Sequence, residues 1–322
     1  MATLGWLMLE VKNLVVEFST GNRGEKVHAV SDISFTVNEG ETLGVVGESG
    51  CGKSTTGRAI MQLVKSTSGD VVFNGVSLAG LSGSELREVR TQMQMIFQDP
   101  ISSLNPRRSV RDIVAEPLFI WKRGTAEEIY AKVDRTLELV GIDPQRAAES
   151  KPHQFSGGQC QRISIARALM LDPRLLICDE PVSALDVSVQ AQVLNLLESL
   201  KKQFKLTLIF IAHDLAVVKN ISDRVAVMYL GQICEMAPSE AIYSKPRHPY
   251  TKLLIDSIPV PDPTIQTLAA EVIGEPPSPI DPPSGCRFHP RCPSATDICR
   301  SEQPQLTETS LGHLVACHHP LG

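Results

Sequence analysis

An octet with three glycines, a lysine and a serine sets the strongest limit on the fold of this chain: Gly47-Glu48-Ser49-Gly50-Cys51-Gly52-Lys53-Ser54. It follows the apolar run Thr42–Val46 and precedes a stretch of helical character, Thr55–Val64. Glycines at these positions let backbone N–H groups turn inward around an anion, and the following helix adds its positive N-terminal end. Strand, glycine loop and helix in this order predict the start of an α/β unit that binds phosphate.

The lysine and the hydroxyl groups of this octet have separate tasks in such a loop. Lys53 is suited to neutralise the β- and γ-phosphates of ATP, and the Ser54 hydroxyl to ligate Mg²⁺. We interpret Cys51 as a bystander with an oxidisable thiol, because its position in the pattern is variable. An ordinary glycine turn with an exposed lysine is the alternative interpretation. The other candidates for contact with the nucleotide in this segment are Gly47, Ser49, Gly50, Gly52 and Thr55.

Polar side chains follow two further apolar runs. Leu175–Cys178 leads into Asp179 and Glu180, and Leu206–Ile211 leads to His213. At the end of a buried strand beside a phosphate loop, Asp179 can hold Mg²⁺ and Glu180 can polarise a water that attacks the γ-phosphate. A histidine at a strand's carboxyl end can touch a bound phosphate. Taken alone, the carboxylates are also explained by a helix N-cap region, and His213 by an ordinary surface position.

The remaining apolar patterns predict strands at both ends of a helical middle section. Strands are predicted at Leu9–Phe18, Ile33–Val37, Asp70–Phe73 and Met93–Phe97, with a turn at Asn74-Gly75. Helical spacing dominates from about 101 to 170, where one face carries Ile129, Val133, Leu137 and Val140. Further helices are predicted at Gln159–Met170 and at Val187–Lys202, the latter with Val189, Val193, Leu196 and Leu200 on one face. The continuous aliphatic strands favour a parallel sheet that is covered on both faces.

Composition narrows the class of protein further. The 322 residues predict two compact units or one domain with an appendage. A net charge of -5 argues against a nucleic-acid partner that is held by bulk charge. The N-terminal stretch Met1–Glu10 lacks the basic region of a signal peptide, and no long apolar run is present that would predict a membrane-spanning helix. If the protein acts at a membrane, we expect other chains to supply the spanning part.

The segment Phe155-Ser156-Gly157-Gly158-Gln159 resembles the signature of ABC ATPases, because it stands just before a predicted helix and upstream of the Asp179-Glu180 strand. The other motifs of that family fall in order. Gln98 resembles the Q-loop glutamine, Ser183–Asp186 the D-loop, His213 the switch histidine, and Phe18 the aromatic residue that stacks on adenine. The resemblance covers residues 9–260. It implies a P-loop (RecA-like) α/β nucleotide-binding domain with an antiparallel β subdomain and an α-helical subdomain at about 101–170.

The resemblance also implies a mechanism that needs two cassettes. In this family each ATP lies between the P-loop of one cassette and the signature of the other. Ser156, Gly157, Gly158, Gln159 and Asp186 would therefore act on the nucleotide of the partner. Glu180, His213 and Gln98 would be catalytic, with Gln98 also near Mg²⁺ and linking the γ-phosphate to the helical subdomain. Hydrolysis would open the dimer and drive the membrane subunits.

Two segments near the C-terminus resemble those of ATPases from peptide importers: Arg247–Thr251 and Gly274–Pro279. They imply import of dipeptides or oligopeptides, powered from the cytoplasmic face of a bacterial inner membrane. The implied partners are a second, related ATPase subunit in a heterodimer, two transmembrane permease subunits and an extracytoplasmic substrate-binding protein. Nickel or glutathione import remains an alternative within this family.

Other classes of ATPase fit the sequence less well. The interval from Ser54 to Ser156 is about 100 residues, too short for the inserted coiled coil of chromosome-associated ABC ATPases. The complete set of catalytic motifs argues against a metal or redox sensor with a secondary ATPase.

Four of the eight cysteines are gathered near the C-terminus: Cys286, Cys292, Cys299 and Cys317. Four thiolates bind zinc or a [4Fe–4S] cluster, and the paired C-x₂-C knuckles of structural zinc sites are absent. From the spacing, zinc, a cluster and plain thiols all remain open. The resemblance to peptide-importer ATPases implies the [4Fe–4S] cluster, with Zn²⁺ as the alternative. We thus expect a nucleotide-binding domain at 1–258, and at 259–322 a proline-rich connection with a small, irregular, cysteine-rich extension.

Overall fold

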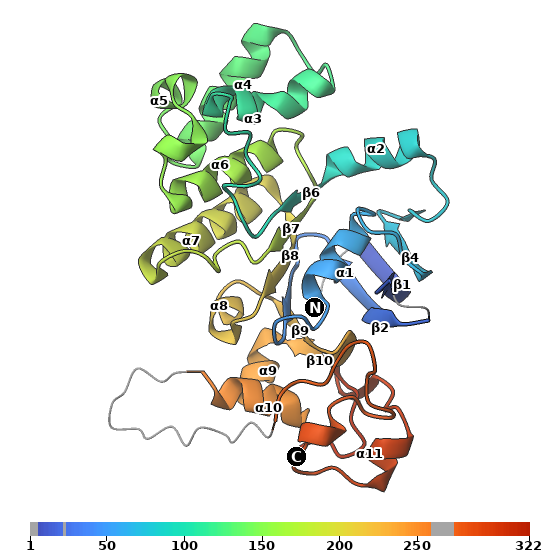
Figure 1. Ribbon diagram of the computed structural model, residues 1–322. Helices are drawn as coiled ribbons and strands as arrows, with labels where there is room; N and C mark the ends of the chain where they lie inside the picture. Colours follow the sequence, from blue (N-terminus) through green and yellow to red (C-terminus); the bar gives the residue numbers. More distant parts are fainter. Residues whose placement is uncertain (1–5, 22–23, 259–273) are drawn as a thin grey trace, which may run out of the picture. The chain divides into compact units, whose positions relative to one another are not determined.

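The computed structural model describes residues 6–21, 24–258 and 274–322 (Figure 1). The interpretation of the first five residues and of the proline-rich connection from 259 to 273 lies outside the described residues. The chain divides into two compact units, one formed by Met1–Ala79 with Phe210–Gly322 and the other by Gly80–Ile209. The chain passes from the first unit to the second after Ala79 and returns after Ile209, within β8 (Thr207–Ala212). A boundary at residue 258 was predicted from motif content rather than from compactness, and it stays a prediction.

The first unit contains an antiparallel sheet of four strands in the order β2-β1-β4-β5. Asn74 and Gly75 join the last two strands with positive φ angles of 49° and 79°, the backbone that a tight hairpin turn requires. The predicted turn is therefore confirmed. The strands span Leu7–Ser19 (β1), Lys26–Asn38 (β2), Ser68–Phe73 (β4) and Val76–Ser77 (β5).

A second group of strands in this unit contains the strand that precedes the glycine loop. β3 (Thr42–Val46) is buried throughout and pairs in parallel with β9 (Arg224–Tyr229). β10 (Gln232–Pro238) lies antiparallel on the other side of β9. Before the C-terminal extension, the unit contains the helices α1 (Lys53–Ile60), α8 (Leu215–Lys219), α9 (Ser239–Ser244) and α10 (Pro249–Asp256). α1 ends four residues before the predicted Val64, because Gln62 adopts a left-handed backbone with φ 54°.

The C-terminal extension has more regular structure than the composition predicts. It contains η2 (His289–Arg291), α11 (Asp297–Ser301), β11 (Thr307–Ser310) and β12 (His313–Val315). β12 pairs antiparallel with β10, so the extension adds two strands to the sheet of the first unit. Buried Glu235 of β10 binds the extension as well, since its carboxylate lies 2.6 Å from Nε2 of His313. The extension is thus attached to the sheet through both backbone and side-chain bonds.

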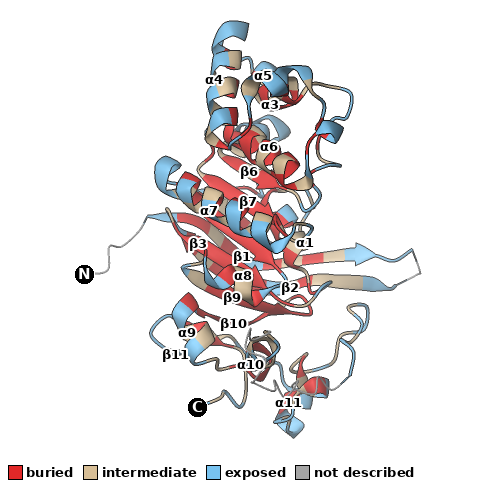
Figure 2. Cartoon of the chain, turned by 90° about the vertical axis from the view of Figure 1, so that its left-hand side faces the viewer, coloured by how far each residue is buried: buried red, intermediate tan, exposed pale blue. Residues whose placement is uncertain are grey.

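The second unit combines two parallel strands with a group of helices. β6 (Met93–Ile96) and β7 (Leu175–Asp179) pair in register, and β7 is completely buried. The helices show buried and exposed faces (Figure 2). Their bounds are Gly83–Gln92 (α2), Val110–Ile120 (α3), Ala126–Leu139 (α4), Pro144–Glu149 (α5), Pro152–Gln154 (η1), Gly157–Leu169 (α6) and Val187–Phe204 (α7).

Two predicted helix faces had different outcomes. In α4, Thr125 and Glu128 form a capping box, and the predicted face of Ile129, Val133 and Leu137 is buried. In α7 the buried residues are Val193, Leu197 and Leu200, so the prediction missed Leu197, and Val189 and Leu196 of the predicted face are only partly buried. Leu196 and Leu197 both fit a helical period from Val193, so only the packing of the helix determines which of the two is buried.

In the part of the chain that the structure describes, we find no helix with the length and apolar character needed to cross a membrane.

Candidate nucleotide-binding site

The glycine loop connects the end of β3 to the start of α1, as predicted. Gly47 and Gly52 have φ angles of 153° and 104°, which favour glycine. A Cβ atom on Gly47 would lie 2.1 Å from the carbonyl oxygen of Met228, and one on Gly52 would lie 2.1 Å from that of Ala29. The fold around the loop therefore demands glycine at both positions, independently of any ligand.

Lys53 is only 4% exposed and lies against the loop that precedes it. Its ammonium group donates hydrogen bonds to the carbonyl oxygens of Gly47 at 2.7 Å and Glu48 at 2.9 Å. These bonds curl the loop around the first turn of α1, where Ser54 and Thr55 are partly exposed. Ser49 and Gly50, at the tip of the loop, are exposed. The arrangement leaves the loop backbone and the Ser54 hydroxyl beside one helix N-terminus, as a phosphate site requires.

Cys51 lies inside the loop with 5% exposure, and its sulfur is 3.8 Å from the Lys53 nitrogen. Burial raises the pKa of the Cys51 thiol. Oxidation proceeds through the thiolate, so burial and a raised pKa both argue against the oxidisable character that we expected.

In the second unit, Asp179 is the last residue of β7 and is fully buried. Glu180 follows it with a left-handed φ of 46°, an uncommon conformation for a residue other than glycine. The amide nitrogen Nε2 of Gln98 donates a hydrogen bond of 3.0 Å to Oε2 of Glu180. Two residues that the sequence placed at the ends of different strands are thus in direct contact. Backbone strain of this kind is typical of functional sites.

The signature segment forms the beginning of α6. Ser156 is the N-cap residue, and its hydroxyl accepts a hydrogen bond from the backbone N–H of Gln159 at 3.3 Å. The Gln159 side chain accepts one from the Ser156 N–H at 3.0 Å, which completes a capping box. Gly157 is partly exposed, whereas Gly158 is buried. A Cβ on Gly158 would lie 2.3 Å from Cγ1 of Val189, so close packing of α6 against α7 already requires this glycine.

The remaining candidates lie near the ends of strands or helices and are exposed. Phe18 lies on β1 opposite Val27 and is 40% exposed, which leaves much of the ring accessible. His213 follows β8 directly and is exposed. Asp186 is exposed at the N-cap position of α7. Phe18, the glycine loop and His213 belong to the first unit, and the other candidates belong to the second.

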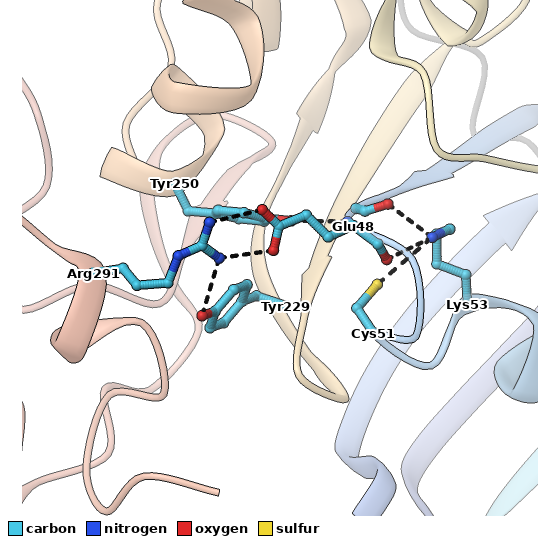
Figure 3. Close-up of polar contacts among 7 residues, drawn as sticks. Glu48, Cys51, Lys53, Tyr229, Tyr250 and Arg291 are labelled. Carbon is cyan, nitrogen blue, oxygen red and sulfur yellow. Dashed lines mark hydrogen bonds and ion pairs between the residues drawn. The ribbon is translucent and has the colours of Figure 1, made fainter. Parts of the chain in front are cut away.

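Sequence reasoning missed a group of side chains that hold Glu48, the second residue of the glycine loop (Figure 3). The guanidinium group of Arg291, in the C-terminal extension, donates two hydrogen bonds to its carboxylate at 2.8 and 2.9 Å. The Tyr250 hydroxyl accepts a hydrogen bond from its backbone N–H at 2.9 Å. These partners are separated from Glu48 by 243 and 202 positions, so no local pattern signals the contact.

The four C-terminal cysteines line one small cavity, together with His248, Phe288, His289, His318 and His319. The backbone N–H of Cys286 donates to the carbonyl of Cys299 at 2.8 Å, and the His319 N–H lies 3.4 Å from the sulfur of Cys317. Burial raises the pKa of Cys286 and Cys292, and raises that of Cys317 to about 11. Across the described ranges, no group of three or more His, Cys, Asp or Glu side chains is placed to hold a metal ion.

The fold and these residues define a class, and comparisons with known proteins agree. Residues 30–183 match the family described as ABC transporter. One similar solved structure is the ATP-binding cassette MJ0796, in a dimeric post-hydrolysis state bound to ADP and Pi. It superimposes with a TM-score of 0.66 at 29% identity, and the match covers 72% of this chain and 99% of that one. CbiO1 from Clostridium perfringens, part of the ABC transporter complex CbiONQ, gives the same TM-score at 28% identity, covering 74% of this chain and 91% of that one. The protein is an ABC-type ATPase.

Its relatives define the family more narrowly. Residues 234–299 match the C-terminal region of oligopeptide/dipeptide transporters. The oligopeptide transport ATP-binding protein OppF of Haemophilus influenzae is 50% identical, covering 97% of this chain and 96% of that protein. The putative oligopeptide transport ATP-binding protein YkfD of Bacillus subtilis is 51% identical, covering 97% and 95%. The chain belongs to the family of ATP-binding proteins of oligopeptide ABC transporters, in which ATP hydrolysis is coupled to transport.

Proposed function

We propose that this chain hydrolyses ATP at the cytoplasmic face of a bacterial inner membrane to energise the import of oligopeptides or dipeptides. The observation that carries the substrate class is the match of residues 234–299 to the C-terminal region of oligopeptide/dipeptide transporters. The match to the ABC transporter family names no substrate, whereas the family matched by residues 234–299 is described by oligopeptide and dipeptide transport. Nickel or glutathione import by the same architecture is the second candidate.

The roles proposed for individual residues come from the family resemblance and, for Glu180, from its hydrogen bond with Gln98. The loop Gly47–Lys53 and the hydroxyls of Ser54 and Thr55 bind the phosphates and Mg²⁺, and Phe18 stacks on adenine. Asp179 adds a carboxylate toward Mg²⁺. Glu180 orients the attacking water, held in place by its hydrogen bond from Gln98. Ser156, Gly157, Gly158, Gln159 and Asp186 serve the nucleotide of a partner cassette, and His213 contacts the γ-phosphate.

The proposed assembly contains two ATPase subunits, two transmembrane permeases and an extracytoplasmic substrate-binding protein. The ATPase partner is a second, related chain in a heterodimer. Residues 1–258 form the cassette and residues 259–322 form the C-terminal extension. The dimeric state of the cassette MJ0796, to which this chain is similar, supports the pairing of two cassettes.

We also propose that Cys286, Cys292, Cys299 and Cys317 hold a [4Fe–4S] cluster. The donor set fits, because the four thiols line one cavity and thiolate is the ligand that such clusters use. Bound there, the group supplies a cross-link that orders a short extension with little apolar surface.

Anaerobic purification of the full chain, followed by iron, sulfide and zinc analysis, tests the cluster. We expect about four irons and four sulfides per chain. The double variant Cys286→Ser/Cys292→Ser should lose them, whereas Cys160→Ser, at a buried cysteine of the second unit, should retain them. If the wild-type chain contains one zinc and no iron, the cysteines bind zinc and the cluster assignment is wrong. A double variant that assembles and transports normally would refute a role in ordering the extension.

Uptake by intact cells tests the transported substrate. A strain that lacks this chain should lose accumulation of a labelled tripeptide or dipeptide, and the wild-type chain should restore it. Lys53→Ala should fail to restore uptake, because the phosphate-binding ammonium group is removed. If the deletion strain keeps peptide uptake but loses nickel or glutathione uptake, peptide import is excluded and the second candidate is supported.

A further inference from the structure

Every polar group of Glu48 is engaged in the structure. Its backbone N–H donates to the Tyr250 hydroxyl, and its carbonyl oxygen accepts from Lys53. Its carboxylate accepts both terminal N–H groups of Arg291 in a bidentate pair. Glu48 is therefore held by three residues, one of which, Arg291, belongs to the C-terminal extension.

Arg291 itself is held rigidly. It is 4% exposed, its guanidinium group lies 5.7 Å from the ring centre of Tyr229 and 6.0 Å from that of Phe288, and it also donates to the Tyr229 hydroxyl at 3.4 Å. The rings of Tyr229, Tyr250 and Phe288 pack against one another with centroids 4.7 to 5.3 Å apart. Little side-chain entropy remains to be lost in the pair, so the contact restrains Glu48 more than an exposed ion pair would.

We infer that Arg291 is a positioning residue of the glycine loop, and that the ATP affinity of this protein depends on the docked C-terminal extension. The inference rests on the proposed binding of ATP by that loop. Two effects act together. Arg291 fixes the backbone that presents N–H groups to the phosphates, and it neutralises a carboxylate that would otherwise repel the anionic nucleotide.

The position of Arg291 in the chain connects this contact to the cysteine cavity. Cys286 and Cys292 both line that cavity, and the segment between them carries Phe288 and Arg291. Phe288 is 1% exposed within the aromatic group. One short segment therefore lines the cysteine cavity and also contacts the glycine loop. The affinity for ATP therefore depends on whether the C-terminal extension is ordered, although the extension is distant from the glycine loop in sequence.

The test measures equilibrium binding of a fluorescent ATP analogue with Mg²⁺ to the full chain, together with hydrogen exchange of residues 47–53. Arg291→Met should raise the Kd about tenfold or more and speed exchange in the loop. Arg291→Lys should raise it by a few-fold, because the charge stays but the bidentate geometry is lost. Arg224→Met is the matched control, since it removes another largely buried pair of the same unit, with Glu41 at 2.9 Å, and should leave the Kd unchanged.

The double variant Glu48→Gln/Arg291→Met separates the positioning effect from the charge effect. Removing the carboxylate should recover only part of the lost affinity, because the uncompensated charge is gone but the loop still lacks its contact with residue 291. A double variant that binds like the wild type would overturn the positioning role, and a wild-type Kd in Arg291→Met would overturn the whole inference. If Arg291→Met does not fold, a wild-type Kd in Arg291→Lys would overturn it equally. A wild-type chain that fails to bind the nucleotide would instead defeat the proposed function.

Discussion

The side-chain amide of Gln98 donates a hydrogen bond of 3.0 Å to the carboxylate of Glu180. The two residues follow neighbouring parallel strands, β6 and β7, whose carboxyl ends meet at the same edge. Glu180 therefore has its carboxylate oriented before any substrate arrives. Because this bond is exposed to solvent, it restrains the Glu180 side chain less than a buried hydrogen bond to an ionised group would.

Glu180→Gln should leave ATP binding intact and reduce hydrolysis by a factor of about 10² or more, because the amide cannot accept a proton from the attacking water. The closed dimer should accumulate with ATP. Phosphate release and size-exclusion chromatography in ATP measure both effects. Glu198→Gln, at an exposed glutamate of α7, is the control and should behave as the wild type. Equal turnover in Glu180→Gln and the wild type would remove Glu180 from the reaction.

Gln98→Ala should lower kcat about tenfold with a smaller change in KM, since it removes the group that orients Glu180 but none of the loop that holds the phosphates. Steady-state ATPase kinetics separate the two constants. Gln94→Ala provides the control, because Gln94 lies on β6 and its side-chain amide donates to the carbonyl oxygen of Arg90. A kcat that is the same in Gln98→Ala and Gln94→Ala would contradict the orienting role.

Gly158→Ala should destabilise the protein by about 1–3 kcal/mol, because the added methyl group would meet Val189 at 2.3 Å. The second substitution Val189→Ala should restore part of the loss by making room. Gly157→Ala, on the same helix turn, should cost less, since its Cβ would meet only Leu185 at 3.6 Å. Denaturant unfolding measures all three variants. If Gly158→Ala is as stable as Gly157→Ala, helix packing does not require this glycine.

His248 should make stability depend on pH. Burial lowers the pKa of this histidine to about 4, from an ordinary value of 6.5. Because the folded-state pKa is depressed, the stability it contributes is complete above pH 6.5 and is lost as the pH falls toward 4. The loss approaches about 3 kcal/mol at the low end.

Thermal unfolding between pH 7.5 and 4.5 measures this effect against His248→Asn. Asparagine keeps an acceptor for the helix cap that His248 provides to the backbone N–H of Tyr250. The variant should therefore show a shallower decline of Tm over this window. Parallel declines in the two proteins would exclude His248 as the source.

Short-range chemistry made much of the site predictable. The glycine loop, the Asp179-Glu180 pair and the signature each lie within a few consecutive residues, and each needs only a strand or a helix end beside it. The helix face of α4 was also predictable, because its apolar residues recur at helical spacing and Thr125 and Glu128 cap its start. Period and capping are local properties of a chain, so a sequence displays them directly.

Local sequence patterns thus establish the presence of a nucleotide loop, its catalytic candidates and the class of ATPase. The tertiary structure alone decided which of Leu196 and Leu197 is buried, why Gly158 has no side chain, and that Arg291 holds Glu48. These outcomes depend on surfaces that meet after folding, with partners up to 243 residues apart. Contacts between such surfaces produce no periodic or local pattern in the sequence, so only the packed structure shows which residues meet.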